Sequence, residues 1–168
     1  MIVEQDTPLF VCGVIGDETT LVVNKCLTGP FKNRYDLATA PVSMTQTMSE
    51  TVTSITAMET GLQTAIEKQL GTLRLLLPAA EAETSVRMIL STFYLLEPVG
   101  GQLLTERPKY TESLSAGAAR VPLDQLNWGN SSPLVLQAKR YLETGAFPIA
   151  DQLITSYTIP SQPKFLLN

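Results

Sequence analysis

The chain has 168 residues, of which 44% are hydrophobic and 17% are charged, and its formal net charge is −4. This length and apolar content suit one globular domain with its own core and are too small for two. We expect neither nucleic acid nor an anionic membrane as a partner, because phosphate binding needs clustered Lys and Arg and the basic residues here are scattered. The lack of histidine excludes Ser-His-Asp and Cys-His catalysis and ordinary zinc sites.

No apolar run in the sequence reaches the length of a membrane span, and no signal-peptide pattern follows Met1. We therefore expect a cytoplasmic protein. The two cysteines, Cys12 and Cys26, both fall in apolar, strand-like sequence. We expect them to be buried as small hydrophobic residues rather than to form a disulfide or act as reactive thiols.

The N-terminal part of the chain predicts two strands. Residues 8–15 are an almost continuous apolar run, which is typical of a buried strand. Residues 16–19 are expected to turn the chain, and residues 20–26 to form the hairpin partner of the first strand. Residues 27–32 contain a Gly-Pro pair and are expected to form a loop, as are residues 38–46.

A helix is predicted from Met48 to Thr60. Thr47 and Glu50 have the spacing of a capping box, and Gly61 supplies the left-handed residue that ends many helices. Apolar residues recur at three- and four-residue steps and predict the buried face. They are Met48, Val52, Ile55, Met58 and Leu62.

Two further strands are predicted after this helix, over residues 70–77 and 85–96, joined by an acidic link. A turn is expected over residues 98–101, followed by a short strand over residues 102–104. Residues 107–115 are polar and are expected to form a loop. A late strand and the turn after it are predicted for residues 117–127.

The second helix is the best-defined element of the sequence. Ser132 is a favourable N-cap residue, Pro133 suits the first helical position, and Gly145 follows the last periodic residue. We expect the helix to cover residues 134–143. Beyond it, a short helix is expected over residues 150–156, with a proline-containing tail from residue 159.

Residues 35–62 resemble the signature segment of the Nudix hydrolase family, written G-x5-E-x7-R-E-U-x-E-E-x-G-U with U apolar. A gap-free comparison keeps the family's residues at Tyr35, Asp36, Leu37, Glu50, Thr51, Val52, Glu59, Thr60, Gly61 and Leu62. Residues 117–126, GAARVPLDQL, resemble a late strand of the same family. The resemblance implies an α/β fold, a Nudix-like alpha/beta/alpha sandwich with a mixed central sheet. We expect this domain to span residues 1–146, with residues 147–168 as a C-terminal extension packed on it or trailing from it.

The residues that carry the family's chemistry are largely replaced. The glycine falls on Ala40, the loop glutamate on Gln46, the arginine on Ser54, and two helix glutamates on Ile55 and Met58. In the family these glutamates hold magnesium or manganese against the substrate pyrophosphate. Ile55 and Met58 offer no oxygen ligand, so we expect no cofactor and no metal site. Only the last glutamate, Glu59, remains, as a vestigial catalytic residue.

Two interpretations of Glu59 stay open. As a relic of a metal site it would face an open cleft. Otherwise it would meet solvent, or the nearby Arg74 or Arg87. Ile55 and Met58 would line a cleft that is less acidic and more apolar than the family's.

Arg34 and Tyr35 are the remaining candidates for ligand binding. By resemblance to the family they could hold a phosphate and stack on a base. The alternative is that both side chains take part in packing around the loop, which we favour.

Two functions follow from this pattern. The first is a Nudix-fold protein that has lost hydrolysis and acts as a binding, sensing or assembly module for a nucleotide-like small molecule, either as a monomer or as a homodimer. The alternative is a divergent Nudix pyrophosphohydrolase that acts on a nucleoside diphosphate linked to another group. It would hold magnesium or manganese with Glu59 and help from Glu50, Glu81 or Glu83.

Overall fold

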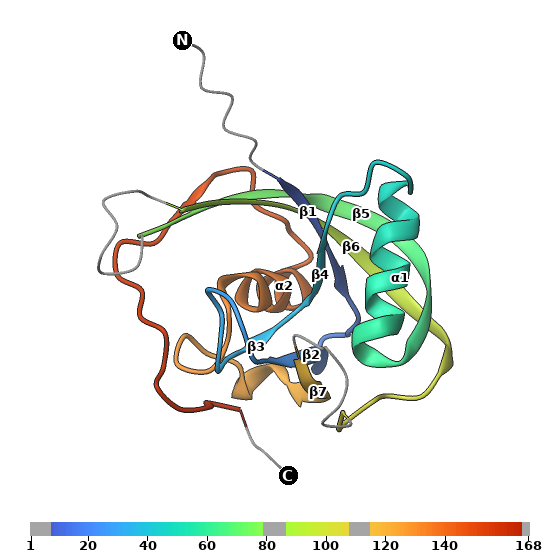
Figure 1. The fold of residues 1–168 in the computed structure, drawn as a ribbon. Helices are drawn as coiled ribbons and strands as arrows, with labels where there is room; N and C mark the ends of the chain where they lie inside the picture. The colour runs from blue at the N-terminus through green and yellow to red at the C-terminus, as the bar shows by residue number, and fades with distance from the viewer. Residues whose placement is uncertain (1–7, 79–86, 108–114, 166–168) are drawn as a thin grey trace.

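Two β-sheets face each other across the core of the protein in the computed structural model, which describes residues 8–78, 87–107 and 115–165 (Figure 1). The larger sheet has five strands in the order β4-β1-β6-β5-β8, and the smaller has three in the order β3-β2-β7. The strands are β1 (Leu9–Val14), β2 (Thr20–Cys26), β3 (Tyr35–Asp36), β4 (Ala38–Pro41), β5 (Leu62–Leu77), β6 (Arg87–Gly101), β7 (Ser115–Pro122) and β8 (Gln152–Leu153).

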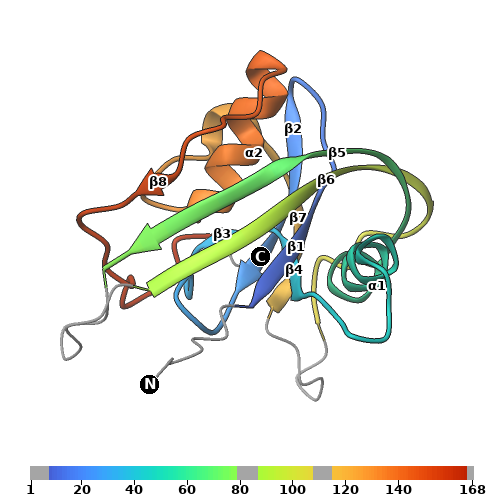
Figure 2. The same ribbon diagram turned by 90° about the horizontal axis from the view of Figure 1, so that it is seen from above.

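Two α-helices and one short 3-10 helix complete the described part of the chain: α1 (Met48–Thr60), α2 (Pro133–Thr144) and η1 (Leu123–Gln125). The two α-helices lie well apart in both ribbon views, with the strand β1 between them (Figure 2). In the larger sheet β1 runs parallel to β6 and β8 parallel to β5, whereas the other pairs are antiparallel. The predicted α/β fold with a mixed sheet is therefore confirmed.

The predicted hairpin between the first two strands is wrong, because β1 and β2 belong to different sheets. Their pairing ends after a single bridge between Gly16 and Leu21. Both edges of β1 are already occupied, one by β4 and the other by β6, so no edge remains for β2. The turn is held by Asp17, whose carboxylate accepts hydrogen bonds from the backbone N–H groups of Thr19 and Thr20.

Both ends of α1 are where the sequence predicts them. The Glu50 N–H donates to Thr47 Oγ1 at 3.1 Å, and the Thr47 N–H donates to Glu50 Oε2 at 2.8 Å, which completes the capping box. Gly61 ends the helix with φ of 79°. A Cβ atom at Gly61 would lie 2.2 Å from the Gln102 carbonyl oxygen, so this turn also needs glycine for space.

The predicted buried face of α1 is wrong in part. Val52 is fully buried, but the Met58 side chain is 62% exposed, and the rest of the buried face is polar. Its members are Thr51, Thr56, Glu59 and Thr60. Thr51 and Thr60 can be buried because each hydroxyl donates to the carbonyl four residues earlier, at 2.9 Å and 2.6 Å.

A glycine in β1 sets how closely α1 approaches the larger sheet. A Cβ atom at Gly13 would lie 2.6 Å from Thr56 Oγ1 and 2.7 Å from Leu96 Cδ1, both closer than real contacts allow. The helix therefore packs on bare backbone here, with Val52 and Thr56 against the strand.

Several strand boundaries differ from the prediction. β5 begins at Leu62 rather than at residue 70, and β6 continues to Gly101, so the turn expected over residues 98–101 is absent. Residues 38–41, expected to be loop, form β4 because they pair with β1. Residues 102–104 form no strand of their own. Part of the loop predicted for residues 107–115 lies outside the described residues.

The second helix begins and ends close to the predicted residues, with Ser132 as N-cap and Gly145 in the left-handed conformation. The short helix predicted for residues 150–156 is wrong, because two of these residues form β8 by pairing with Leu75 and Leu76 of β5. The following segment packs on the fold, and Phe165 is a buried member of its core. The domain boundary at residue 146 stays a prediction.

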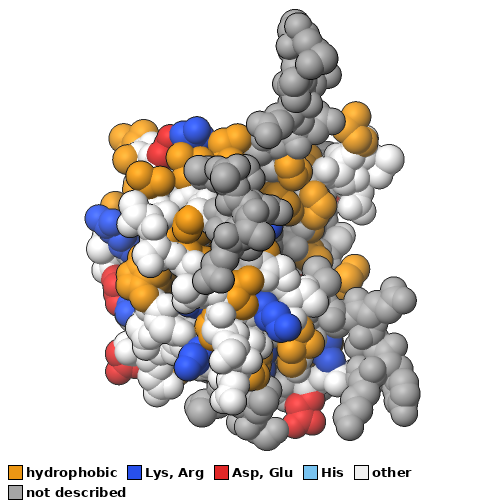
Figure 3. Space-filling model, turned by 60° about the vertical axis from the view of Figure 1, so that its left-hand side comes forward, with side chains coloured by type: hydrophobic (Ala, Val, Ile, Leu, Met, Phe, Trp, Pro, Cys, Tyr) orange, Lys and Arg blue, Asp and Glu red, His pale blue; other side chains and the backbone are white. Residues whose placement is uncertain are grey.

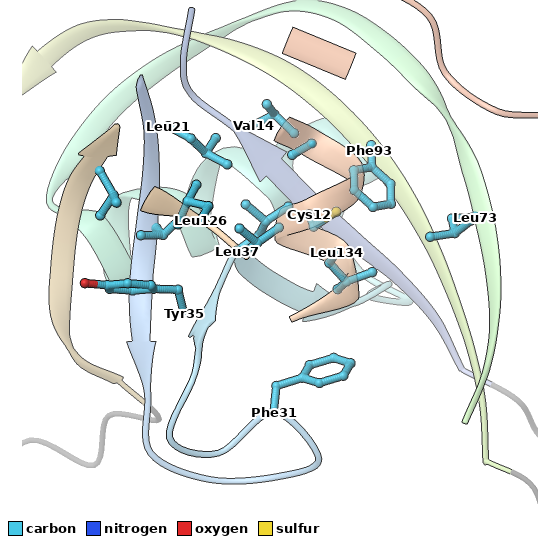
Figure 4. Packing of buried hydrophobic residues seen from close by; sticks show 14 of the residues in the cluster. Cys12, Val14, Leu21, Phe31, Tyr35, Leu37, Leu73, Phe93, Leu126 and Leu134 are labelled. Atoms are coloured by element: carbon cyan, nitrogen blue, oxygen red, sulfur yellow. The ribbon is translucent and has the colours of Figure 1, made fainter. Parts of the chain in front are cut away.

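The main core lies between the two sheets (Figure 4). Leu21 from β2, Phe93 from β6 and Leu134 from α2 point toward one another there and are each at most 1% exposed. A smaller cluster around Val52 and Tyr94 joins α1 to the larger sheet. None of the helices in the described ranges is long and apolar enough to cross a membrane.

Candidate functional site

A pocket of about 490 Å³ opens between the two sheets, where the starts of β1 and β6 meet the end of β2. Its volume lies in the range of small-molecule sites. The end of α1 contributes Glu59 to its wall, and the start of α2 contributes Leu134. Most of the wall is apolar, with Phe10, Phe31, Leu37, Met88, Ile89 and Leu134 among the lining residues. The site is therefore an apolar cavity into which a few polar groups project.

Two of these polar groups, Asn24 and Asp36, are placed side by side by the smaller sheet. They are directly opposed in the antiparallel pairing of β2 with β3, so their side chains share one face, the face toward the pocket. Asn24 is only 4% exposed. Its Oδ1 atom is buried and has no hydrogen-bond partner among the described residues. A buried amide oxygen without a partner costs free energy unless a ligand or water supplies a donor.

The carboxyl group of Asp36 is tied to the start of α2. The Ser132 hydroxyl donates to Asp36 Oδ1 at 2.7 Å. Ser132 Oγ in turn accepts a hydrogen bond from the Val135 N–H at 3.2 Å, as the N-cap of α2. Burial raises the pKa of Asp36 to about 6, although the hydrogen bonds from Ser132 and from the backbone of Leu37 lower it. Asp36 is therefore mostly, but not completely, ionised at neutral pH.

Glu59 also lines the pocket, and its partner is Arg107 rather than Arg74 or Arg87. Nη2 of Arg107 lies 3.9 Å from Glu59 Oε2 and donates to the Met58 carbonyl oxygen. Burial raises the pKa of Glu59, and the attraction of Arg107 only partly opposes this. The expected partner Arg74 instead pairs with Asp151 at 2.5 Å. Arg87 is exposed and stands at the edge of the pocket.

The two apolar replacements in the family segment do not line the pocket. Ile55 is partly exposed and Met58 mostly exposed, and neither is among the lining residues. Acidic side chains on the face drawn in Figure 3 lie apart from one another. Within residues 8–78, 87–107 and 115–165, no three His, Cys, Asp or Glu side chains are grouped so as to hold a metal. Glu81 and Glu83 lie outside the described residues. The described residues do not fit the family's divalent metal ion.

Arg34 and Tyr35 do not line this pocket, and both are buried, at 8% and 5% exposure. Arg34 donates to the Tyr157 hydroxyl at 3.1 Å and to the Thr158 carbonyl at 2.8 Å, and its guanidinium stacks 4.8 Å from the Tyr157 ring. Tyr35 packs against Phe165 with ring centroids 5.8 Å apart. Both side chains thus hold the C-terminal segment against the fold.

The two cysteines are free thiols. Cys12 is fully buried, as predicted, and burial raises the pKa of its thiol. Cys26 is half-buried and lines the pocket. Burial and the nearby carboxylates of Asp36 and Glu59 raise the pKa of its thiol to about 12, so it is protonated at neutral pH and a poor nucleophile.

Sequence reasoning missed Asn24 and the pocket role of Asp36. Asn24 is the one amide in the apolar strand TLVVNKC, and a polar residue inside such a run is the signal that could have identified it. Asp36 lies within the segment that resembles the family, but its contact with Ser132 spans 96 positions of the chain. No local pattern predicts such a contact.

A search of protein-family models and of curated protein sequences gives no match to this chain. Solved structures do match it. A NUDIX hydrolase from Nitrosomonas europaea has a TM-score of 0.66 and 13% identity over 92% of this chain and 82% of that one. A MutT NUDIX hydrolase from Burkholderia pseudomallei has a TM-score of 0.63 and 14% identity over 81% and 98%.

A third structure is the NUDIX domain of Shewanella oneidensis NrtR complexed with ADP ribose. Its TM-score is 0.58 and its identity 15%, over 84% of this chain and 87% of that one. At such identities the likeness concerns the fold, and it agrees with the resemblance carried by residues 35–62. The chain has the fold of the Nudix hydrolases.

Proposed function

We propose that this protein is a Nudix-fold module that binds a small molecule in the pocket between its sheets and does not hydrolyse it. The observation that carries the proposal is that α1 lacks most of the carboxylates that the family keeps on this helix. Position 58 is a solvent-exposed methionine, position 55 an isoleucine, and the remaining Glu59 is buried beside a guanidinium. An intact pocket is thus combined with a helix that lacks the oxygen ligands for hydrolysis.

The Glu59–Arg107 pair supports this proposal because it disfavours a second cation at the same carboxylate. A guanidinium 3.9 Å away already provides positive charge next to Glu59. At an effective dielectric constant near 20, a unit charge at about 4 Å contributes about 4 kcal/mol, so a divalent ion arriving beside Arg107 would be repelled by about twice that amount. This repulsion weakens the attraction of Glu59 for the ion, and a single carboxylate is also fewer protein oxygen ligands than such ions usually take.

A nucleotide-like molecule is the ligand class that the fold favours. The NUDIX domain of NrtR is a structural neighbour that was crystallised with ADP ribose. The pocket volume of about 490 Å³ is sufficient for a nucleoside-sized ligand. We propose that binding does not depend on magnesium, since Asn24, Asp36 and the apolar wall supply the contacts.

The test is turnover and binding measured on the same preparation. ADP-ribose, NADH and nucleoside diphosphate sugars are incubated with Mg²⁺ or Mn²⁺, and products are separated by chromatography. The same ligands are then titrated by calorimetry with Mg²⁺ or with EDTA. The proposal expects no product, and for any ligand that binds, the same affinity with and without the metal.

Two variants make the result decisive. Glu59→Gln removes the last family carboxylate, and Glu97→Gln is the matched control on the exposed part of β6. If the protein only binds, neither variant should differ from the wild type in turnover, which is absent in all three. Turnover that Glu59→Gln abolishes and Glu97→Gln retains would establish the divergent pyrophosphohydrolase instead.

A further inference from the structure

The polar groups of the pocket are unevenly divided between donors and acceptors. Three neutral donors on its wall are already used: Cys26, Thr39 and Ser115 each donate to a backbone carbonyl oxygen at 3.0 to 3.1 Å. The acceptors are not used in the same way. Among the residues that the structure describes, Asn24 Oδ1 is buried without a hydrogen-bond partner and Glu59 accepts no hydrogen bond, while Glu59 lies 3.9 Å from Arg107. The buried polar atom that a ligand could satisfy is therefore an acceptor, whereas the exposed Thr28 hydroxyl is a further neutral donor on the wall.

The charge of the wall has the same bias. Asp36 and Glu59 are its two acids, and Arg87 is its single base within the described residues. Asp36 lies deep beside Ser132, whereas Arg87 is exposed at the first position of β6. A phosphate placed in this pocket without a metal would thus bring negative charge toward two carboxyl groups that have little water to screen them, and of the two only Glu59 has a guanidinium nearby, that of Arg107.

Resting on the proposed binding function, and narrowing its nucleotide-like ligand to the part without phosphate, we propose that the pocket selects a phosphate-free ligand. This ligand is a compact apolar ring system that carries N–H donors and is neutral or positively charged. Its N–H groups donate to Asn24 Oδ1 and to the carboxylate oxygen of Asp36, which the β2–β3 pairing places on one face. Its rings fill the apolar space next to Phe10, Phe31 and Leu134. Nitrogen heterocycles and aromatic amines have this chemistry, and di- and triphosphates do not.

The experiment compares matched probes in the absence of divalent metal, with EDTA present, by calorimetry or ligand-observed NMR at neutral pH. Adenosine, AMP and ADP-ribose share one base and differ in phosphate. Tryptamine and indole-3-acetate share one ring and differ in the sign of their charge. We expect adenosine to bind at least about ten times more tightly than AMP or ADP-ribose, and tryptamine at least about ten times more tightly than indole-3-acetate, a factor that corresponds to about 1.4 kcal/mol.

Substitutions in and outside the pocket test which residues produce these differences in binding. Asn24→Leu should weaken adenosine binding about tenfold or more, whereas Gln137→Leu, which removes another buried amide with an unpartnered atom outside the pocket, should leave it unchanged. Circular dichroism and thermal melting check that both variants fold. Asp36→Asn keeps an acceptor for Ser132 and loses only the charge, so it should reduce the preference for tryptamine over indole-3-acetate without a change in fold.

The outcomes separate this proposal from the function on which it rests. Equal or tighter metal-free binding of ADP-ribose or indole-3-acetate, without turnover, overturns the ligand class and leaves a binding module. Failure of both adenosine and tryptamine to bind at millimolar concentration overturns it as well. Metal-dependent turnover of ADP-ribose overturns the proposed function itself.

Discussion

Replacing Asp36 by asparagine should stabilise the protein, and more so at high pH than at low pH. Asp36 is partly buried in the pocket wall, and burial raises its pKa from 3.8 to about 6. Asparagine has the same shape and can still accept the Ser132 hydrogen bond, so the substitution removes mainly the cost of a buried charge. A shift of about two units corresponds to about 3 kcal/mol between the fully protonated and fully ionised forms.

The sign follows from proton binding. Between the unfolded pKa and the folded pKa the native state binds more protons, so the stability that the neutral acid provides is present at low pH and is lost as pH rises through about 6. Between about pH 5 and about pH 8, the ionisation of Asp36 should therefore lower the unfolding free energy of the wild type by about 1 to 2 kcal/mol. The Asp36→Asn variant has no such loss, because asparagine does not ionise.

Urea denaturation of both proteins at several pH values gives the difference in unfolding free energy. It should grow with pH in favour of Asp36→Asn, whereas Asp124→Asn, a change at an exposed aspartate on η1, serves as the control and should show no such trend. A difference that is constant with pH, or that favours the wild type at high pH, would refute the assignment of a buried, destabilised carboxylate.

Three further predictions concern α1 and its surroundings. Gly13→Ala places a methyl group 2.6 Å from Thr56 Oγ1 and should lower the unfolding free energy by about 1 to 3 kcal/mol; a neutral result in urea denaturation would mean that α1 does not pack as described. Thr47→Ala removes the capping box and should cost about 1 kcal/mol by the same assay, with no loss counting against the cap. Arg107→Gln should raise the pKa of Glu59 further in an NMR titration of the side-chain carboxyl carbon, because it removes the charge that lowers that pKa; an unchanged titration would exclude the ion pair.

Local signals predicted well what depends on local structure. The two helices begin and end near the predicted residues because their caps, Thr47 with Glu50 and Ser132 with Pro133, act within a few positions of the chain. The fold class followed from the resemblance over residues 35–62, whose spacing is preserved.

The failures concern what depends on the rest of the fold. The stripe of apolar residues on α1 suggested a buried Met58, yet the helix buries threonines instead. The hydroxyls of Thr51 and Thr60 bond back to the helix, and Gly13 leaves room for Thr56. The first hairpin was wrong because β4 and β6 occupy both edges of β1, and periodicity says nothing about which strands pair. The pocket could not be predicted for the same reason, since Asn24 and Asp36 meet only through strand pairing.

The central claim is the proposed lack of a divalent-metal site. Mn²⁺ binding measured by electron paramagnetic resonance tests this claim most directly, because the free ion gives the signal and each bound ion removes it. Titration of the full chain with Mn²⁺ should show no saturable site at micromolar concentration, in the wild type and in Glu59→Gln alike. A micromolar site in the wild type that Glu59→Gln eliminates would contradict the account.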